Sequence, residues 1–317
     1  MIPASAVLPD GALSRAGRLA PGARVAVVAP SGPVPEERLR AGLDILRGWG
    51  LEVTVAPHVL TTHREFGYLA GSDSDRAQDL QDAWCDPSVD AVFCARGGYG
   101  VQRMVDLVDW AAMRAAGPKV FVGFSDITAL HEAFAVRAGL ATLHGPMVAG
   151  LDFIGTRATQ EHLRATLFEP ETVQTHAAGR ALTPGRAEGV VLGGCLSLLA
   201  SDLGTPHARP SARGGLLCIE DVGEEDYRLD RCLTQLLRSG WLEGVRGVLL
   251  GSWVDCGPPG EVRAVLADRL VGLGVPVAEE FGFGHSEGAR TIPFGLPATL
   301  GTEADCASLT YEVPALR

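Results

Sequence analysis

The first half of the chain alternates short apolar runs with amphipathic segments, and this repetition constrains the fold more than any other feature. The apolar runs have the length and β-branched content of buried strands and lie at 24–29, 52–56, 91–94, 120–123 and 140–144. Predicted helices separate them at 35–49, 73–84, 101–108 and 125–138. This alternation predicts a parallel sheet with helices on both faces, an α/β domain of the Rossmann or flavodoxin type.

A second α/β unit is predicted to begin near residue 187. It has strand runs at 189–192, 216–219 and 247–251, helices at 195–203, 226–238 and 260–271, and short strands from 277 onward. The segment before it is interrupted by Gly and Pro and is predicted to be a helix-bearing linker. We therefore predict an N-terminal domain over 1–150, a linker over 151–186 and a C-terminal domain over 187–317.

Composition narrows the classes of partner and compartment. The formal charge of −11 comes without a basic block, which argues against nucleic acid and anionic membranes as partners. The apolar runs are far too short to span a bilayer, and the first ten residues lack the pattern of a signal peptide. The seven cysteines are scattered without C-x-x-C spacing, which is typical of reduced thiols. We expect a cytoplasmic protein.

The first chemical signal is Ser125, which stands two residues after the apolar run 120–123 and opens a predicted helix. A sharp strand-to-helix turn of this kind presents a serine nucleophile with its hydroxyl exposed above a helix N-terminus. The G-x-S-x-G spacing of the α/β-hydrolases is absent, because Asp126 and Ile127 follow the serine. The alternative is that Ser125 simply caps the helix.

A serine nucleophile needs a base, and a carboxylate usually orients that base. His285 follows Gly284 in a loop, where glycine allows close approach of the backbone to a site. Glu220 ends the apolar run 216–219, and sites form at the carboxyl ends of parallel strands. The alternatives are a polar loop histidine and a carboxylate that favours the N-terminus of the next helix.

Backbone N–H donors for an oxyanion are expected in the glycine loop 96–100 and just after the serine. We assign this role to the N–H groups of Gly98 and Asp126. The competing interpretation of the loop as a phosphate cradle ranks lower, because the spacing G-x-x-x-x-G-K-[ST] is absent. His144, at another strand end, is either an alternative base or a structural histidine bonded to backbone, and we favour the structural role. No spacing typical of metal ligands is found, so no metal or cofactor is expected.

The sequence resembles the LD-carboxypeptidase family, the serine peptidases that include the microcin C immunity hydrolases. Ten stretches carry the resemblance in order: Val28 to Pro33, Gly67 to Asp73, Cys94 to Gly100, Pro118 with Gly123 to Thr128, His144 to Met147, Gly193 to Leu199, Gly204 to Pro206, Glu220 to Glu224, Tyr227 to Arg231, and Gly284-His285 with Thr291 to Gly295.

The resemblance implies a catalytic triad of Ser125, Glu220 and His285, the residues that the chemistry had already singled out. It also implies an N-terminal parallel α/β domain, a C-terminal domain with a small β-barrel-like sheet, a site in the cleft between them, and a homodimer. The implied activity is release of terminal D-Ala from murein tetrapeptide, a small muropeptide substrate, in peptidoglycan recycling. The alternative is an immunity-type amidase acting on peptidyl or aminoacyl nucleotides.

An exopeptidase must bind a free carboxylate, which arginine does well. Arg96, in the glycine loop, is our candidate, with Tyr99 as a further substrate contact; alternatively, Arg96 braces the loop through backbone carbonyls. The chain departs from the family in having Cys195 where asparagine is common and Phe124 where tyrosine is usual. The segment 150–187 is short and has no tryptophan, unlike the longer loop of microcin-type members, which favours the murein enzyme.

Overall fold

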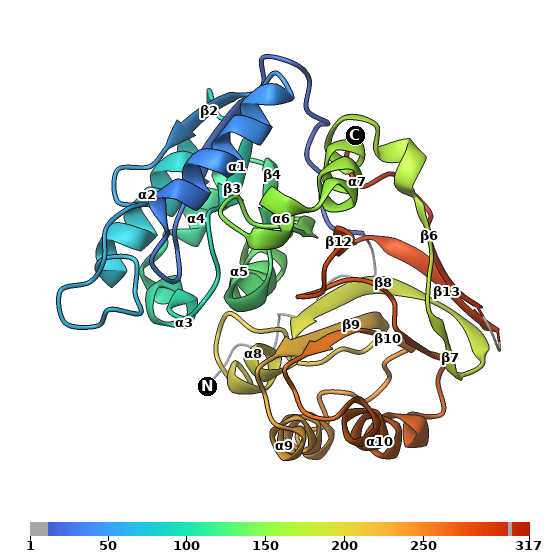
Figure 1. Cartoon of the computed structure of the whole chain (residues 1–317). Helices are drawn as coiled ribbons and strands as arrows, with labels where there is room; N and C mark the ends of the chain where they lie inside the picture. Colours follow the sequence, from blue (N-terminus) through green and yellow to red (C-terminus); the bar gives the residue numbers. More distant parts are fainter. Residues whose placement is uncertain (1–11, 304–305) are drawn as a thin grey trace.

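The computed structural model describes residues 12–303 and 306–317, which build two sheets with helices packed around them (Figure 1). The first sheet has the order β12-β5-β4-β3-β1-β2. Its strands are β1 (Arg24–Val28), β2 (Glu52–Val55), β3 (Ala91–Cys94), β4 (Val120–Gly123), β5 (Thr142–His144) and β12 (Ile292–Phe294). The strands β1 to β5 are parallel, which confirms the predicted N-terminal sheet. Short strands were predicted from 277 onward, but not that one of them, β12, joins this first sheet and pairs antiparallel with β5.

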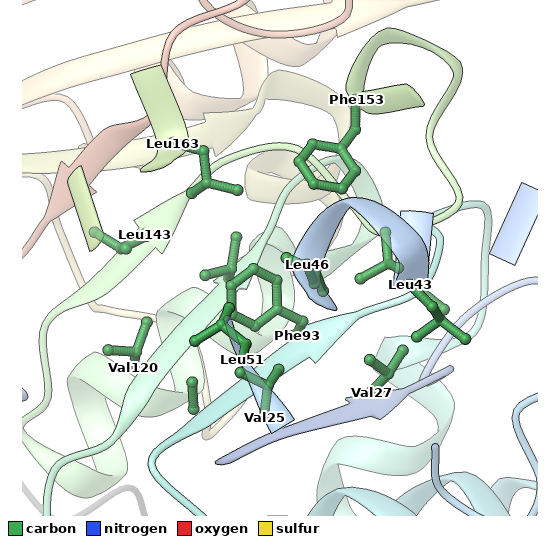
Figure 2. Close-up of a cluster of buried hydrophobic side chains, with 14 of the residues drawn as sticks. Val25, Val27, Leu43, Leu46, Leu51, Phe93, Val120, Leu143, Phe153 and Leu163 are labelled. Carbon is green, nitrogen blue, oxygen red and sulfur yellow. The ribbon is translucent and has the colours of Figure 1, made fainter. Parts of the chain in front are cut away.

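Helices cover both faces of this sheet, as alternate side chains of its strands require. They are α1 (Glu36–Gly48), α2 (Asp73–Cys85), α3 (Val101–Met104), α4 (Trp110–Ala115) and α5 (Thr128–Ala133), the last followed by a π-helical turn at Phe134–Ala138. Val25 and Val27 pack with Leu43 and Leu46 of α1 on one face (Figure 2). Ala26 and Val28 point to the opposite face and the second apolar cluster.

The predicted linker 151–186 is divided between the two parts of the fold. Its helices α6 (Leu151–Gly155) and α7 (Arg157–Phe168) contribute Phe153 and Leu163 to the apolar cluster that also holds Leu43 and Leu46 of α1 (Figure 2). A 3₁₀ turn at Pro170–Val173 follows, and β6 (Thr175–Ala177) and β7 (Arg180–Thr183) then join the second sheet. The domain boundaries given above stay predictions.

The second sheet has the order β6-β14-β13-β8-β9-β10-β11-β7. Its other strands are β8 (Gly185–Cys195), β9 (Gly215–Val222), β10 (Gly247–Val254), β11 (Val277–Glu279), β13 (Pro297–Glu303) and β14 (Cys306–Tyr311). Strands β8 to β11 are parallel and the others antiparallel. The hydroxyl of Thr302 on β13 donates to the Thr183 carbonyl at 2.9 Å, so the sheet curls until β7 approaches β13.

Helices α8 (Leu196–Ser201), α9 (Asp226–Arg238) and α10 (Pro259–Leu270) cover one face of the second sheet, and a 3₁₀ turn at Val271–Leu273 extends α10 (Figure 1). Leu229, Leu233 and Leu236, at helical spacing, form the buried stripe of α9. Within residues 12–303 and 306–317, no helix is both long and apolar enough to cross a membrane.

Two buried histidines, His131 and His176, and the half-buried His162 predict a loss of stability in acid. Burial lowers the pKa of His131 and His176 to about 3 and that of His162 to about 4. Below pH 6.5 these histidines are therefore protonated in the unfolded chain. In the folded chain they stay neutral until the pH falls to about 4 or below. The free energy of unfolding is expected to fall by up to about 1.4 kcal/mol per pH unit for each histidine in this window.

Urea unfolding at a series of pH values from 7 to 4 measures this slope. His176 Nε2 has no hydrogen-bond partner in the described part of the chain, so His176→Leu is expected to make the slope shallower. A slope that stays the same in His176→Leu would contradict the assignment.

Candidate active site

Ser125 occupies a strained turn between β4 and α5. Its φ angle is +65°, a left-handed conformation that non-glycine residues adopt at a cost and that recurs at functional sites. The residue before it, Phe124, is extended, and a 3₁₀ turn (Ser125–Ile127) leads into α5. The turn has Phe124 at its N-cap position with no side-chain capping bond, so the capping alternative for Ser125 is wrong.

Asp126 ties the Ser125 turn to two neighbouring strand ends. Its buried carboxylate accepts hydrogen bonds from the Ser31 hydroxyl and, at 3.0 Å, from the Val101 backbone N–H. Burial raises the pKa of Asp126, although these hydrogen bonds oppose the shift. The side chain therefore links the loops that follow β1, β3 and β4. These loops lie at the sheet edge where the sequence predicted the site.

The glycine loop after β3 lies directly against the serine. A Cβ on Gly97 would come within 3.0 Å of Ser125 Cβ and 3.1 Å of its Oγ, so only glycine fits there without displacement. The Gly97 carbonyl accepts from the Gly32 N–H at 3.1 Å, which fixes the loop. Among the described residues the Gly98 N–H donates to no acceptor, and the oxyanion role of Gly98 and Asp126 stays a prediction.

Glu220 and His285 form a pair in which the carboxylate is buried and the imidazole is half-buried. Glu220 stands near the end of β9 with no exposed surface, and its Oε2 lies 2.6 Å from His285 Nδ1. Burial alone would raise the pKa of Glu220, but its contacts with His144 and His285 outweigh burial and lower the pKa below its usual value. The carboxylate is therefore ionised and able to hold one tautomer of His285.

The loop of His285 is fixed by backbone contacts. The Ser252 hydroxyl oxygen accepts from the N–H groups of His285 and Ser286 at 2.7 and 3.2 Å. Gly284 has a φ of +101°, and a Cβ there would lie 2.6 Å from Glu220 Oε2. Glycine is needed at this position because the chain must pass against the carboxylate.

The serine turn and the histidine loop face one cavity of about 250 Å³. The rings of Phe124 and His285 both line it, with their centroids 4.7 Å apart. No hydrogen bond joins Ser125 to His285 in the described chain, and such bonds are often long until substrate binds. The cavity therefore lies between Phe124, the residue before Ser125, and His285, whose imidazole pairs with the Glu220 carboxylate.

Of the two residues predicted to contact substrate, Arg96 lines the cavity and Tyr99 does not. Arg96 lines the cavity together with Arg38 and Arg290, and its Nη1 also donates to the Pro33 carbonyl at 2.6 Å, so it braces the loop as the alternative held. Tyr99 is 46% exposed, packs edge-on against Tyr68 and does not line the cavity.

His144 does not have the role favoured from the sequence. It is buried, but neither ring nitrogen has a hydrogen-bond partner among residues 12–303 and 306–317. The prediction that His144 is a structural histidine bonded to backbone is therefore wrong. Its Nε2 instead faces Glu220 Oε1 at 3.9 Å, too long for a hydrogen bond but close enough for electrostatic contact.

Two residues of the predicted linker hold the His285 loop and were missed from the sequence. Asp152 Oδ1 accepts from the Gly288 N–H at 3.0 Å, and His162 Nδ1 accepts from the Thr291 N–H at 3.2 Å. Neither residue belongs to a motif, and only the docking of α6 and α7 against the loop reveals them.

Cys195 lies behind the glutamate, paired in register with it between β8 and β9. Its backbone N–H donates to Thr128 Oγ1 at 2.9 Å, and its Sγ lies 3.1 Å from Asp221 Oδ1. Burial raises the pKa of the thiol, so Cys195 is an inert packing residue that links α5 to the second sheet.

Comparison with known proteins matches both parts of the chain to one family. Residues 25–145 match the LD-carboxypeptidase N-terminal domain and residues 188–300 the LD-carboxypeptidase C-terminal domain. The chain belongs to the LD-carboxypeptidase family, and the family supports a peptidase hydrolase.

Individual relatives agree with this assignment. A Streptomyces coelicolor protein whose name, carboxypeptidase, is itself a prediction is 74% identical to this chain. The alignment covers 96% of this chain and 98% of that protein. The murein tetrapeptide carboxypeptidase of Pseudomonas aeruginosa is 35% identical over 87% of this chain and 92% of its own. The crystal structure of muramoyltetrapeptide carboxypeptidase from Oxalobacter formigenes superposes with a TM-score of 0.79, at 29% identity, over 92% of this chain and 99% of that one.

Proposed function

We propose that the protein is a serine LD-carboxypeptidase that releases terminal D-Ala from murein tetrapeptide. The observation that carries the proposal is the contact of 2.6 Å between Glu220 Oε2 and His285 Nδ1. His285 lines the cavity together with Phe124, the residue before the strained Ser125. The murein substrates named for the relatives from P. aeruginosa and O. formigenes support the choice of substrate. Cytoplasmic location and a homodimer stay predictions.

In this mechanism Ser125 Oγ attacks the carbonyl that joins an L-configured centre to D-Ala. His285 takes the hydroxyl proton and later gives it to the amine of the departing D-Ala. Glu220 holds the tautomer of His285 and stabilises its charged form. The N–H groups of Gly98 and Asp126 are assigned to the oxyanion. Water then hydrolyses the acyl-enzyme with His285 as base, which restores the serine.

The charge of the cavity suits a peptide with free carboxylates. Three arginines, Arg38, Arg96 and Arg290, line it, while the oxygens of the one lining carboxylate, Asp152, already accept hydrogen bonds from Gly288 and Thr159. Positive charge therefore predominates in the cavity.

The direct test is D-Ala release from murein tetrapeptide in the presence of EDTA, with Ser125→Ala as the paired control. Release by the wild type alone would support a serine LD-carboxypeptidase. An aminoacyl-sulfamoyl adenylate in a parallel reaction tests the amidase alternative. Cleavage of the adenylate without D-Ala release would replace our proposal with that alternative.

Arg96→Lys is expected to raise KM for the tetrapeptide about tenfold with little change in kcat. Lysine keeps the charge and can still donate to Pro33, but it loses bidentate binding of a carboxylate. Steady-state kinetics measure the split. Arg40→Lys, on the exposed face of α1 where Arg40 pairs with Glu36, is the matched control. An unchanged KM in Arg96→Lys would remove Arg96 from substrate binding.

A further inference from the structure

His144 is buried among aromatic rings beside the proposed triad, and it is also one of the residues that line the cavity. It ends β5, is 1% exposed, and pairs in register with Gly123 at the end of β4. The rings of Phe124, Phe283 and Phe294 surround it at centroid distances of 5.6, 5.9 and 5.2 Å. A polar group in such a place is costly unless it is paired.

Three polar atoms at this point lack partners in the described part of the protein. They are the two ring nitrogens of His144 and Oε1 of Glu220. Buried polar atoms are nearly always hydrogen-bonded, so a group of three requires an explanation. Two of them, His144 Nε2 and Glu220 Oε1, face each other at 3.9 Å and are complementary as donor and carboxylate acceptor.

The neighbouring His131 shows what a structural histidine looks like in this core. Its ring lies 6.1 Å from that of His144, and it is buried to the same degree. His131 Nδ1 pairs with Thr142 Oγ1 at 2.8 Å and its Nε2 with the Gly123 carbonyl at 2.9 Å. Both nitrogens of His131 are satisfied by the fold, whereas those of His144 are not.

We propose that His144 is a positioning residue for Glu220, donating its Nε2–H to Oε1 in the working enzyme. The proposal rests on the function proposed above. A side-chain shift of about 1 Å would bring the atoms to the distance of a charge-assisted hydrogen bond. The carboxylate is then held on both sides, by His285 through Oε2 and by His144 through Oε1. His144 keeps its proton throughout and touches no reacting atom.

This second contact matters when His285 becomes positively charged. The carboxylate must then be ionised and aimed at His285 Nδ1. The charged and titratable groups around Glu220 are His285 and His144 at its two oxygens, with Asp221 next in sequence and Cys195 opposite it in register. Of these, the two histidines are the donors that face the carboxylate oxygens.

The test compares His144→Met, which fills the space without a donor, with His144→Gln, which carries an amide donor near the position of Nε2. Ser125 reactivity is followed with a fluorophosphonate probe, which reports activation of the serine without the peptide substrate, and D-Ala release is measured beside it. We expect His144→Met to lower the labelling rate and kcat about 10- to 100-fold, the effect of losing one hydrogen bond to a charged group, with KM unchanged. His144→Gln should recover most of the rate.

Melting temperatures, with His131→Gln as a control variant, distinguish a positioning role of His144 from a role in packing alone. The His131 variant is expected to have a lower melting temperature than the wild type, but its Ser125 should react with the probe at nearly the wild-type rate. Equal rates in His144→Met and His144→Gln would overturn the proposal. If the Met variant does not fold, His144→Asn replaces it, because its amide is one methylene too short to reach Glu220 and must also label slowly.

The outcomes keep the two proposals apart. Rapid labelling of the wild type without D-Ala release would reject the tetrapeptide substrate, while the His144 variants would still be judged by labelling. A wild type that labels no faster than Ser125→Ala would overturn the nucleophile assignment and the role of His144 with it.

Discussion

Ser125→Ala is expected to lower kcat for D-Ala release by about six orders of magnitude, the loss seen when a triad serine is removed. The hydroxyl oxygen is the only non-hydrogen atom lost. The cavity, its lining arginines and the Glu220–His285 pair do not depend on it. Tetrapeptide binding should therefore stay near the wild-type value. Discontinuous D-Ala assays and equilibrium binding measure the two quantities separately.

Ser125→Gly is the informative companion variant. Ser125 has a φ of +65°, which alanine tolerates no better than serine but glycine adopts freely. We expect Ser125→Gly to be as inactive as Ser125→Ala but more stable than it by about 1 kcal/mol, the lower range of the strain cost of a left-handed residue. Residual peptidase activity above a thousandth of wild type in either variant would contradict the nucleophile assignment.

The sequence was informative wherever chemistry coincided with a strand end. The residues Ser125, Glu220 and Gly97 all follow or end apolar strand runs, and parallel strands present their carboxyl ends at one edge. Glycines at 97 and 284 marked the loops whose backbones must approach a side chain closely. Local pattern and topology therefore sufficed to nominate these positions.

Long-range pairing could not be foreseen in the same way. The short strand β12 crosses from the last part of the chain to β5, and no periodicity in three residues reveals such a partner. Asp152 and His162 hold the His285 loop only because α6 and α7 dock against it. His144 carried the right residue type, but its nearness to Glu220 depends on how two sheets meet.

Glu220→Gln is expected to lower kcat about 10⁴-fold, as in other triads that lose the carboxylate charge. Glutamine has nearly the same shape, so it fits beside Gly284, but it cannot stabilise a charged imidazole. If its amide NH₂ turns toward His285 Nδ1, the imidazole is also held in the tautomer whose Nε2 carries a proton, and it cannot then accept the proton of Ser125. The pH dependence of kcat, measured on folded protein, reports the loss.

Asp221→Asn is the matched control, because Asp221 is the next residue and equally buried but faces away from the triad, accepting from Cys195 Sγ and the Ser197 N–H. Its substitution should lower the melting temperature through lost hydrogen bonds while kcat falls far less than in Glu220→Gln. Both substitutions replace a buried carboxylate by its amide, so both are expected to lower the melting temperature, and kcat is the quantity that separates them. Equal losses of kcat in the two variants would mean that the Glu220 carboxylate acts through the fold and not through His285.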